Sequence, residues 1–536
     1  MKKFFNYAAL IFIIVFFGCE SGTQNRINSL SKEGKESLST GDYEGAKGKF
    51  SEILSLDGSH CDGLYGMLLG EMMAFIDSVY GYIDLTNSIT GNQSAQSGLR
   101  LQQAGVVDGV IYEVANIFLD YFKNLDFYAV RVKEMKCSFS LSMLPISRSG
   151  IEFRGEWDEH EAHFISMLSN GGKAIVNFLI AHNLDVNTVP IRDARDSGLL
   201  KFNPEDVVVF LRSVGFIVET SPELLKWSTN AVRRASFDAV PQYCAAMFHE
   251  AKELLNIFTE QDKTPYDDII AWVDVDNDGI PSSGDKLILN VYKMDTGEPA
   301  VDLSGYTGIF LPILASSMDD WRAKITRVED AFAFRLSSGE RISFDEILPW
   351  FGSMLGISNT LEFDIIALFK GMDYTGENVR PLRDLLPYLF DHDGNSSTYQ
   401  IFLVEGEIFG TPLQGKEGYL FNGDAKHFGI GTDWNPSDTS IDHASGEIKP
   451  DCAVPNQTGM QIGIDSYGNP VYLPLIYVGW PDPSFNGAVY TNDGGTCADS
   501  SQFSKTTVYR LNKELNRLIA GWGNFFYAAV AGGVSF

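Results

Sequence analysis

Ile27–His60 reads INSLSKEGKESLSTGDYEGAKGKFSEILSLDGSH, and this stretch predicts a pair of antiparallel helices. Gly34 has no side chain, so the two helices can approach each other closely at this point. The segment TGDY turns the chain, and Ala46 and Phe50 lie one helical turn apart, on the face that packs back on the first helix. Because a single hairpin cannot bury its own apolar face, we expect a helix beginning near Asp62 to cover it.

The same stretch resembles one tetratricopeptide repeat. Glu33 stands where the repeat usually has leucine and Gly58 where it usually has proline, so the repeat is degenerate, and a generic helical hairpin is the alternative. The resemblance covers about 34 residues of the chain and implies a helical module that binds protein partners. The matching positions are Gly34, Gly41, Asp42, Tyr43, Ala46, Phe50, Leu54, Leu56 and Asp57.

The remaining pattern indicates an α+β protein. Over 62–266 apolar residues recur at spacings of three and four, as in helices, and the segments KCSFSLSMLPI and GIEFRGEW predict one β-hairpin. From Ala271 strands and short helices mix, and from Tyr399 short strands lie among Gly, Pro, Asn and aromatic residues before a terminal helix. The predicted domains are a helical domain at 27–270, a mixed region at 271–398 and a β-rich region at 399–536.

Length and charge narrow the class of protein. At roughly 100–200 residues per domain, 536 residues correspond to two to four domains. The chain has 41 basic and 70 acidic residues, a formal net charge of −29. This charge repels a phosphate backbone, so we expect no nucleic-acid partner. The excess of carboxylates suits divalent cations.

The first residues predict export. The N-terminus reads MKKFFNYAALIFIIVFFGCESG, with an apolar run of about eleven residues, Tyr7–Phe17, after two lysines. A membrane span needs about 20 residues, so this run suits the core of a signal peptide. Gly18 followed by Cys19 resembles the lipobox of bacterial lipoproteins, which implies removal of residues 1–18 and lipidation of Cys19. Residues 19–26 then form a short tether.

Two neighbouring residues refine this prediction. Phe16 departs from the leucine that is usual in the lipobox, and an ordinary secretory signal is the alternative. Glu20 stands where lipoproteins of the enterobacterial inner membrane carry aspartate, so the outer membrane is preferred. We therefore expect a lipid-anchored protein of the cell envelope.

The other cysteines suggest one disulfide. Five cysteines remain besides Cys19, so at least one stays unpaired. Cys452 and Cys497 lie in polar segments rich in Gly, Pro and Asn, and we predict that they are bonded to each other. The absence of a CxxC spacing argues against a zinc site built on cysteines. Three cysteines in apolar, helix-like surroundings are interpreted as small core residues: Cys61, Cys137 and Cys244.

An acidic stretch predicts a calcium loop. Asp274–Asp285 reads DVDNDGIPSSGD, with acidic residues at the first, third, fifth and twelfth positions and Gly279 at the sixth. This is the ligand spacing of an EF-hand loop, in which carboxylates and carbonyls bind a hard cation. An acidic turn without metal is the alternative. The predicted ligands are Asp274, Asp276, Asp278, the Ile280 carbonyl, Ser282 through its hydroxyl or a water, and Asp285.

The flanks of this loop are similar to dockerin-type calcium loops rather than to sensor EF-hands. Pro281 has no amide hydrogen to pair with a second loop, and the segment KLILNVY alternates like a strand. The resemblance implies a structural ion that fixes a turn. A second stretch, Asp391–Ser397, has Asp391, Asp393 and Asn395 at the first spacings but lacks the glycine and the final acid.

Three other segments each resemble a catalytic or phosphate-binding motif but lack a residue that the motif requires. The segment GTPLQGKE has Glu417 where a phosphate loop needs Ser or Thr. The segment EHEAHF places His160 and His163 three apart, whereas zincins need four, and HEAKE at 249–253 lacks the second histidine. No reaction can be assigned from these motifs.

Two functions remain open at this point. The first is a membrane-anchored lipoprotein that binds proteins or serves as a scaffold, with one structural calcium site. The second is an extracytoplasmic hydrolase of glycan or peptide, with its site in the aromatic C-terminal region. A deep pocket lined by carboxylates or histidines would favour the hydrolase.

Overall fold

The computed structural model describes residues 23–91, 106–187, 217–258, 268–347 and 362–385, with short gaps, and isolated short strands between 401 and 490. Among these residues helices predominate and strands are shorter, so the α+β class is confirmed. The chain forms two compact units, each built from three separate segments. Unit 1 comprises Met1–Asn92, Asn116–Lys173 and Ala246–Arg322; unit 2 comprises Gln93–Ala115, Ala174–Ala245 and Ala323–Phe536.

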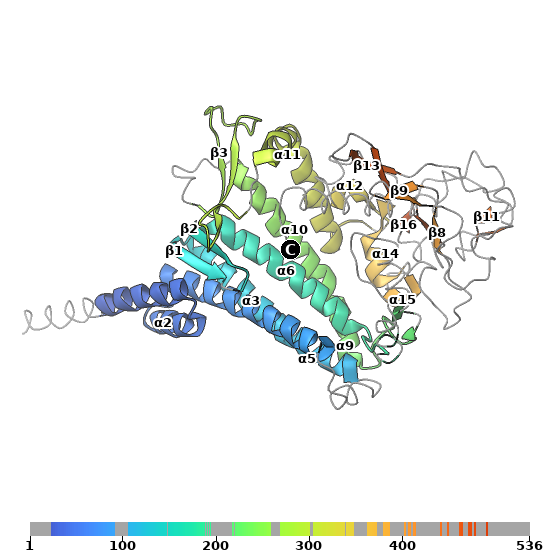
Figure 1. The fold of residues 1–536 in the computed structure, drawn as a ribbon, viewed down its shortest axis with the longest axis horizontal. Helices are drawn as coiled ribbons and strands as arrows, with labels where there is room; N and C mark the ends of the chain where they lie inside the picture. Colours follow the sequence, from blue (N-terminus) through green and yellow to red (C-terminus); the bar gives the residue numbers. More distant parts are fainter. Residues whose placement is uncertain are drawn as a thin grey trace, which may run out of the picture. The chain divides into compact units, whose positions relative to one another are not determined.

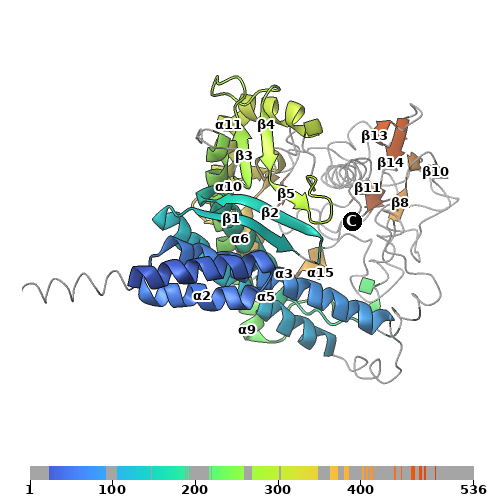
Figure 2. The same cartoon turned by 60° about the vertical axis from the view of Figure 1, so that its left-hand side comes forward.

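Unit 1 begins with the helical hairpin. A helix at residues 23–40 is followed by a turn in which Gly41 has φ +79°, and then by α2 (Tyr43–Leu56). Asp42 caps α2, because its carboxylate accepts the amide hydrogen of Gly45 at 3.0 Å. The covering helix is α3 (Cys61–Gly91), which begins one residue before the predicted position and lies along α2 in both views (Figures 1 and 2).

Phe50 sets the spacing of these helices. Its side chain is fully buried, and a Cβ atom added at Gly34 or at Gly66 would come within 2.7 Å or 2.3 Å of its ring. The ring therefore occupies space that a larger residue at either position would need. On its other sides it meets Phe139 edge-on, with ring centroids 5.9 Å apart. Ala46 is also fully buried.

A disulfide joins Cys61, at the start of α3, to Cys137, which follows α5 (Val106–Met135). Their Cα atoms are 5.1 Å apart, although 76 positions separate them in the sequence. Both residues belong to the core, as the sequence predicted, but the sequence analysis did not predict the bond between them. The sequence pattern showed apolar surroundings, and Cys137 is indeed 2% exposed, but it could not show that the two segments meet.

The sheet of unit 1 has the strand order β1-β2-β5. The predicted hairpin is present: β1 (Phe139–Ile146) pairs antiparallel with β2 (Ile151–Trp157), with a register shift between Leu141 and Leu144. Strand β2 also pairs with β5 (Val291–Lys293), and the sheet is visible in Figure 2. Its buried side chains, including Phe139 and Trp157, belong to the same core as the helical hairpin.

Among the described residues, one helix has the length and apolar composition of a membrane span. It is the long helix α6 (Glu159–Ala181). However, 56% of its most apolar stretch of 18 residues is buried inside the protein. It also carries Lys173, which pairs with Asp126 of α5 at 2.7 Å. Ser166 and Asn170 donate to the same carboxylate at 2.7 Å and 3.2 Å. These features are those of a core helix with an internal polar contact.

Unit 2 contains a small aromatic core. It is formed by Ala174, Ala181, Phe237 and Val240, against which Trp227 and Phe369 pack. The start of α5 and the end of α6 also belong to this unit. Its other regular elements within the described residues include α9 (Ala231–Arg234), η2 (Ala235–Ala239), β6 (Ile342–Ser343), α12 (Phe344–Ile347), β7 (Glu362–Phe363), α14 (Ile365–Lys370) and α15 (Leu382–Leu385).

The last described elements of unit 2 are short strand pairs. The predicted strands in YQIFLVEGEIF and PVYLPLIYVGW are present as β8 (Ile401–Leu403), β9 (Gly406–Ile408), β14 (Pro470–Leu473) and β15 (Ile476–Val478). β8 pairs with β15, although more than seventy positions separate them. The predicted terminal helix lies outside the described residues.

Candidate metal centre

A two-stranded hairpin of unit 1 carries the acidic loop. β3 (Ile270–Val273) and β4 (Lys286–Leu289) pair antiparallel, and Val273 lies opposite Lys286. Residues 274–285 therefore form the connection at the end of the hairpin. The alternating residues of KLILNVY, which predicted a strand, form β4 and, after Asn290, β5.

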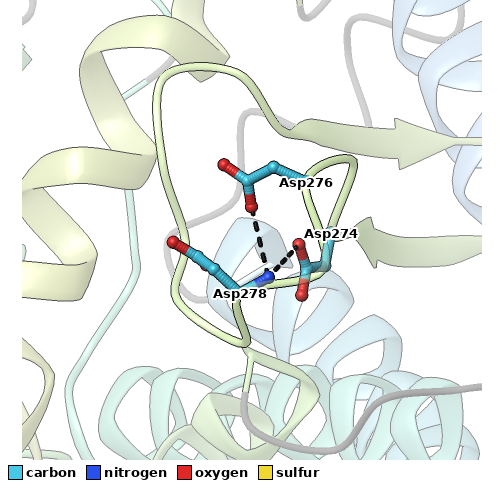
Figure 3. Close-up of side chains that lie close together, drawn as sticks. All are labelled: Asp274, Asp276 and Asp278. Atoms are coloured by element: carbon cyan, nitrogen blue, oxygen red, sulfur yellow. Dashed lines mark hydrogen bonds between the residues drawn. The ribbon is translucent and has the colours of Figure 1, made fainter.

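Three of the predicted ligands lie together. One oxygen from each of Asp274, Asp276 and Asp278 lies within 4.8 Å of the others. Figure 3 shows carboxylate oxygens of Asp274 and Asp276 directed at the backbone nitrogen of Asp278, each at 3.3 Å. Two of the three side chains, Asp276 and Asp278, are exposed. Oxygen ligands of this kind suit Ca²⁺ or another hard divalent cation.

The loop backbone produces this arrangement. Gly279 has φ +77°, as expected for the sixth position, and its amide donates to Asp274 at 2.7 Å. Asn277 also has a positive φ of 60°, a conformation that asparagine tolerates better than most residues. The amide of Ile280 donates to Asp278 at 2.8 Å. The tight turn thus brings alternate side chains to one side of the loop.

Asp285, the twelfth residue, has a different role from the other three acids. It is 3% exposed, and its two oxygens accept the amide hydrogens of Val275 and Ser282 at 2.8 Å and 2.7 Å. It therefore ties together the two ends of the loop and does not belong to the group of three carboxylates. The Ser282 hydroxyl accepts from the amide of Gly284 at 3.1 Å, and the Ile280 side chain is exposed.

The electrostatics of the three carboxylates are unequal. Desolvation raises the pKa of Asp274, but the amides of Gly279, Asn277 and Asp278 outweigh it, so its pKa is lowered overall. For Asp276, desolvation together with the negative charges of Asp278 and Asp285 raises the pKa. A bound cation would relieve this repulsion. Protonation of Asp276 and cation binding therefore oppose each other.

The base of the hairpin is fixed to the start of α6. Glu161 accepts the amide hydrogen of Ile270 at 3.1 Å through one oxygen and that of Asp158 at 2.8 Å through the other. The second bond is the backbone contact of a helix capping box. At the same end of the hairpin, the Asn290 side chain donates to the carbonyl of Asp268 at 2.6 Å. The acidic loop is therefore the free end of a hairpin held at its base.

Sequence reasoning missed a second charged cluster in unit 1. The buried carboxylate of Glu250 accepts from Lys133 at 2.5 Å and contacts Nδ1 of His163 at 2.6 Å. Desolvation raises the pKa of Glu250, but these two partners outweigh it and lower the pKa overall. Glu250 and His163 belong to the two zincin-like fragments, which α6 and α10 (Val240–Leu254) bring together. The lysine makes the cluster unsuitable for a cation.

Several predicted site residues lie outside the described residues. These are the lipidation residue Cys19, the proposed disulfide pair Cys452 and Cys497, and the second acidic stretch at Asp391–Ser397. Of the three cysteines assigned to the core, Cys244 is a free thiol, and burial raises its pKa to about 11, which makes it an inert packing residue.

Comparisons of the chain with protein-family models, with curated protein sequences and with solved structures give no match. The class that the described residues define is thus an α+β protein with an N-terminal helical hairpin and an acidic hairpin loop.

Proposed function

We propose that this chain is a lipid-anchored protein of the cell envelope that binds a protein partner or organises an assembly. Residues 27–60, which resemble a tetratricopeptide repeat, and the long helices that follow form the binding module. The loop at 274–285 holds one structural calcium ion. The Cys61–Cys137 disulfide supports this location, because disulfides persist mainly outside the cytosol.

An exposed phenylalanine and a half-buried arginine beside it carry the binding role. Phe127 of α5 is 54% exposed, and the Arg131 guanidinium lies over its ring at 5.6 Å. Arg131 also donates to the Gly58 carbonyl, in the loop that leads from α2 to α3. Val130, on the same helix, is exposed as well. Exposed aromatic and arginine side chains are the residues that most often anchor protein interfaces.

Site-directed photocrosslinking in the native envelope tests this role. A photoreactive phenylalanine analogue at Phe127 should give a discrete adduct with one protein, and Arg131→Ala should diminish that adduct. The matched control places the analogue at Lys123, an exposed position one turn earlier in α5. If the two positions give the same diffuse adducts or none, the binding role at this surface is wrong.

Thermal unfolding with millimolar calcium and with chelator tests the metal site. Extracellular calcium modules of this type bind at roughly 10⁻⁴–10⁻³ M, and an ion that binds only the folded state raises the melting temperature. Asp276→Ala should abolish the rise, while Asp295→Ala, an exposed acid outside the loop, should preserve it. Buried Trp272, two residues before Asp274, offers a fluorescence readout. Equal melting temperatures in calcium and chelator would leave 274–285 as an acidic turn.

A further inference from the structure

His182 is held in one protonation state by two backbone groups of unit 2. It follows α6, is 1% exposed, and places Nδ1 at 2.7 Å from the carbonyl oxygen of Phe178. The backbone nitrogen of Leu382 lies 3.1 Å from Nε2. A carbonyl can only accept and a peptide amide can only donate. Nδ1 therefore carries the hydrogen, Nε2 carries the lone pair, and the imidazole is neutral.

Leu382 belongs to a short segment that we call the strap, residues 379–383. The indole nitrogen of Trp227 donates to the carbonyl of Val379 at 3.3 Å, and the amide of Arg383 donates to the carbonyl of Leu225 at 3.0 Å. The fully buried guanidinium of Arg383 donates to the carbonyls of Val218, Ser221 and Leu224 at 3.0 to 3.3 Å. The strap is thus bonded to segment 218–227 at both ends and to His182 between them.

The surroundings of His182 disfavour a positive charge. Its ring stacks on Trp227, with centroids 4.6 Å apart, and Phe237 lies edge-on to it. Desolvation outweighs the bond to Phe178 and lowers the pKa of His182 below its ordinary value.

The charged groups on the neighbouring elements are mostly cations. Arg233 donates to the His182 carbonyl at 3.1 Å, Arg234 lies over the Trp227 ring, and Arg383 lies in the strap. The carboxylate of Asp108 already pairs with Arg233. Of the other charged residues in these segments, Lys226 pairs with Glu223 at the surface, Arg380 is exposed, and Asp185 is half-buried.

We propose that His182 is an acid-operated latch for the strap. When a proton from solvent adds to the lone pair of Nε2, the ring nitrogen becomes a donor and faces the donor N–H of Leu382, so their hydrogen bond breaks. The ring is fixed by Phe178 and by the stack on Trp227, whereas the strap is a short segment. Loss of the bond therefore loosens residues 379–383 from His182 and leaves the bonds of Val379 and Arg383 to hold them to segment 218–227.

Hydrogen exchange of the full-length protein between pH 7.5 and pH 5 tests the latch, after correction for the intrinsic pH dependence of exchange. The protection factor of peptides covering 379–385 should fall at least tenfold as the pH drops. Its dependence on pH should fit the uptake of a single proton. His182→Gln, which has no titrating ring, should show strap protection that is independent of pH. His249→Gln, at an exposed histidine of α10, should retain the wild-type transition.

The opposite results overturn the proposal. Strap protection that stays constant across the pH at which nitrogen NMR shows Nε2 to become protonated, or a transition that persists in His182→Gln, means that His182 does not hold the strap. Where His182→Gln fails to fold, nitrogen NMR of the wild-type protein decides between the outcomes. Protonation of Nε2 without loss of protection at 379–383 then contradicts the latch, and protonation at the same pH as the loss supports it.

Discussion

Glu161 accepts a hydrogen bond from the backbone amide of Ile270, 109 positions further along the chain, so one carboxylate fixes both the start of α6 and the start of the acidic hairpin. Burial, with a smaller contribution from the negative charge of Asp158, raises the pKa of Glu161 to about 8. In the unfolded chain a glutamate titrates near 4.3. The folded protein therefore retains a proton that the unfolded chain releases.

This difference predicts the pH dependence of stability. The contribution of Glu161 to the free energy of unfolding is complete below about pH 4.3 and falls as the pH rises towards 8, by up to about 1.4 kcal/mol per pH unit. In urea unfolding at pH 5, 6.5 and 8, the free energy of unfolding of Glu161→Gln should therefore fall less steeply with pH than that of the wild type. Glu159→Gln, in the same helical turn, should keep the wild-type slope. If the free energy of unfolding depends on pH equally in the wild type and in Glu161→Gln, the pKa of Glu161 is not raised in the folded protein.

The disulfide should contribute substantially to stability. Cys61 and Cys137 close a loop across 76 positions, and disulfides typically stabilise a protein by about 2–4 kcal/mol, more for longer loops. Replacing both residues by alanine should lower the urea midpoint accordingly, whereas Cys244→Ala, which removes a free thiol, should cost much less. Mass spectrometry of the native protein after alkylation should find Cys61 and Cys137 unmodified. Rapid alkylation of both without reductant would exclude the bond.

The helical hairpin should be intolerant of larger residues at its contact face. Ala46 is fully buried, so Ala46→Leu should overpack the hairpin and cost about 1–3 kcal/mol. Gly48, on the same helix, is exposed, and a Cβ added there meets nothing within 4 Å. Gly48→Ala should therefore stabilise the protein by about 0.5–1 kcal/mol. Equal effects of the two substitutions would mean that the face of α2 is misassigned.

The lipid anchor rests on the sequence and has its own test. Because Cys19 follows a short apolar core and Gly18, the wild-type protein should incorporate labelled fatty acid and sediment with membranes. Cys19→Ser should prevent labelling and move the protein to the soluble fraction, while Cys244→Ser should do neither. A wild-type protein that sediments without incorporating fatty acid would contradict lipidation.

Local patterns predicted the elements that form near their own residues. The turn after Thr40, the β-hairpin of β1 and β2, and the positive φ of Gly279 all follow from residues within a few positions of each other. For the candidate metal site, the same reasoning located three carboxylates that the structure places within 4.8 Å of one another. It assigned Asp285 to the same group, whereas backbone amides of the folded loop occupy both of its oxygens.

The amino-acid sequence by itself determined the helical and strand periods, the turn residues and the acidic loop, because each depends on backbone preferences and side-chain spacing within one segment. Tertiary structure alone decided that Cys61 meets Cys137, that Glu250 lies between Lys133 and His163, and that His182 accepts a bond from Leu382. These contacts join residues 76 to 200 positions apart. The packing of whole helices and strands decides which distant residues come into contact. The spacing of residues within one segment does not determine that packing.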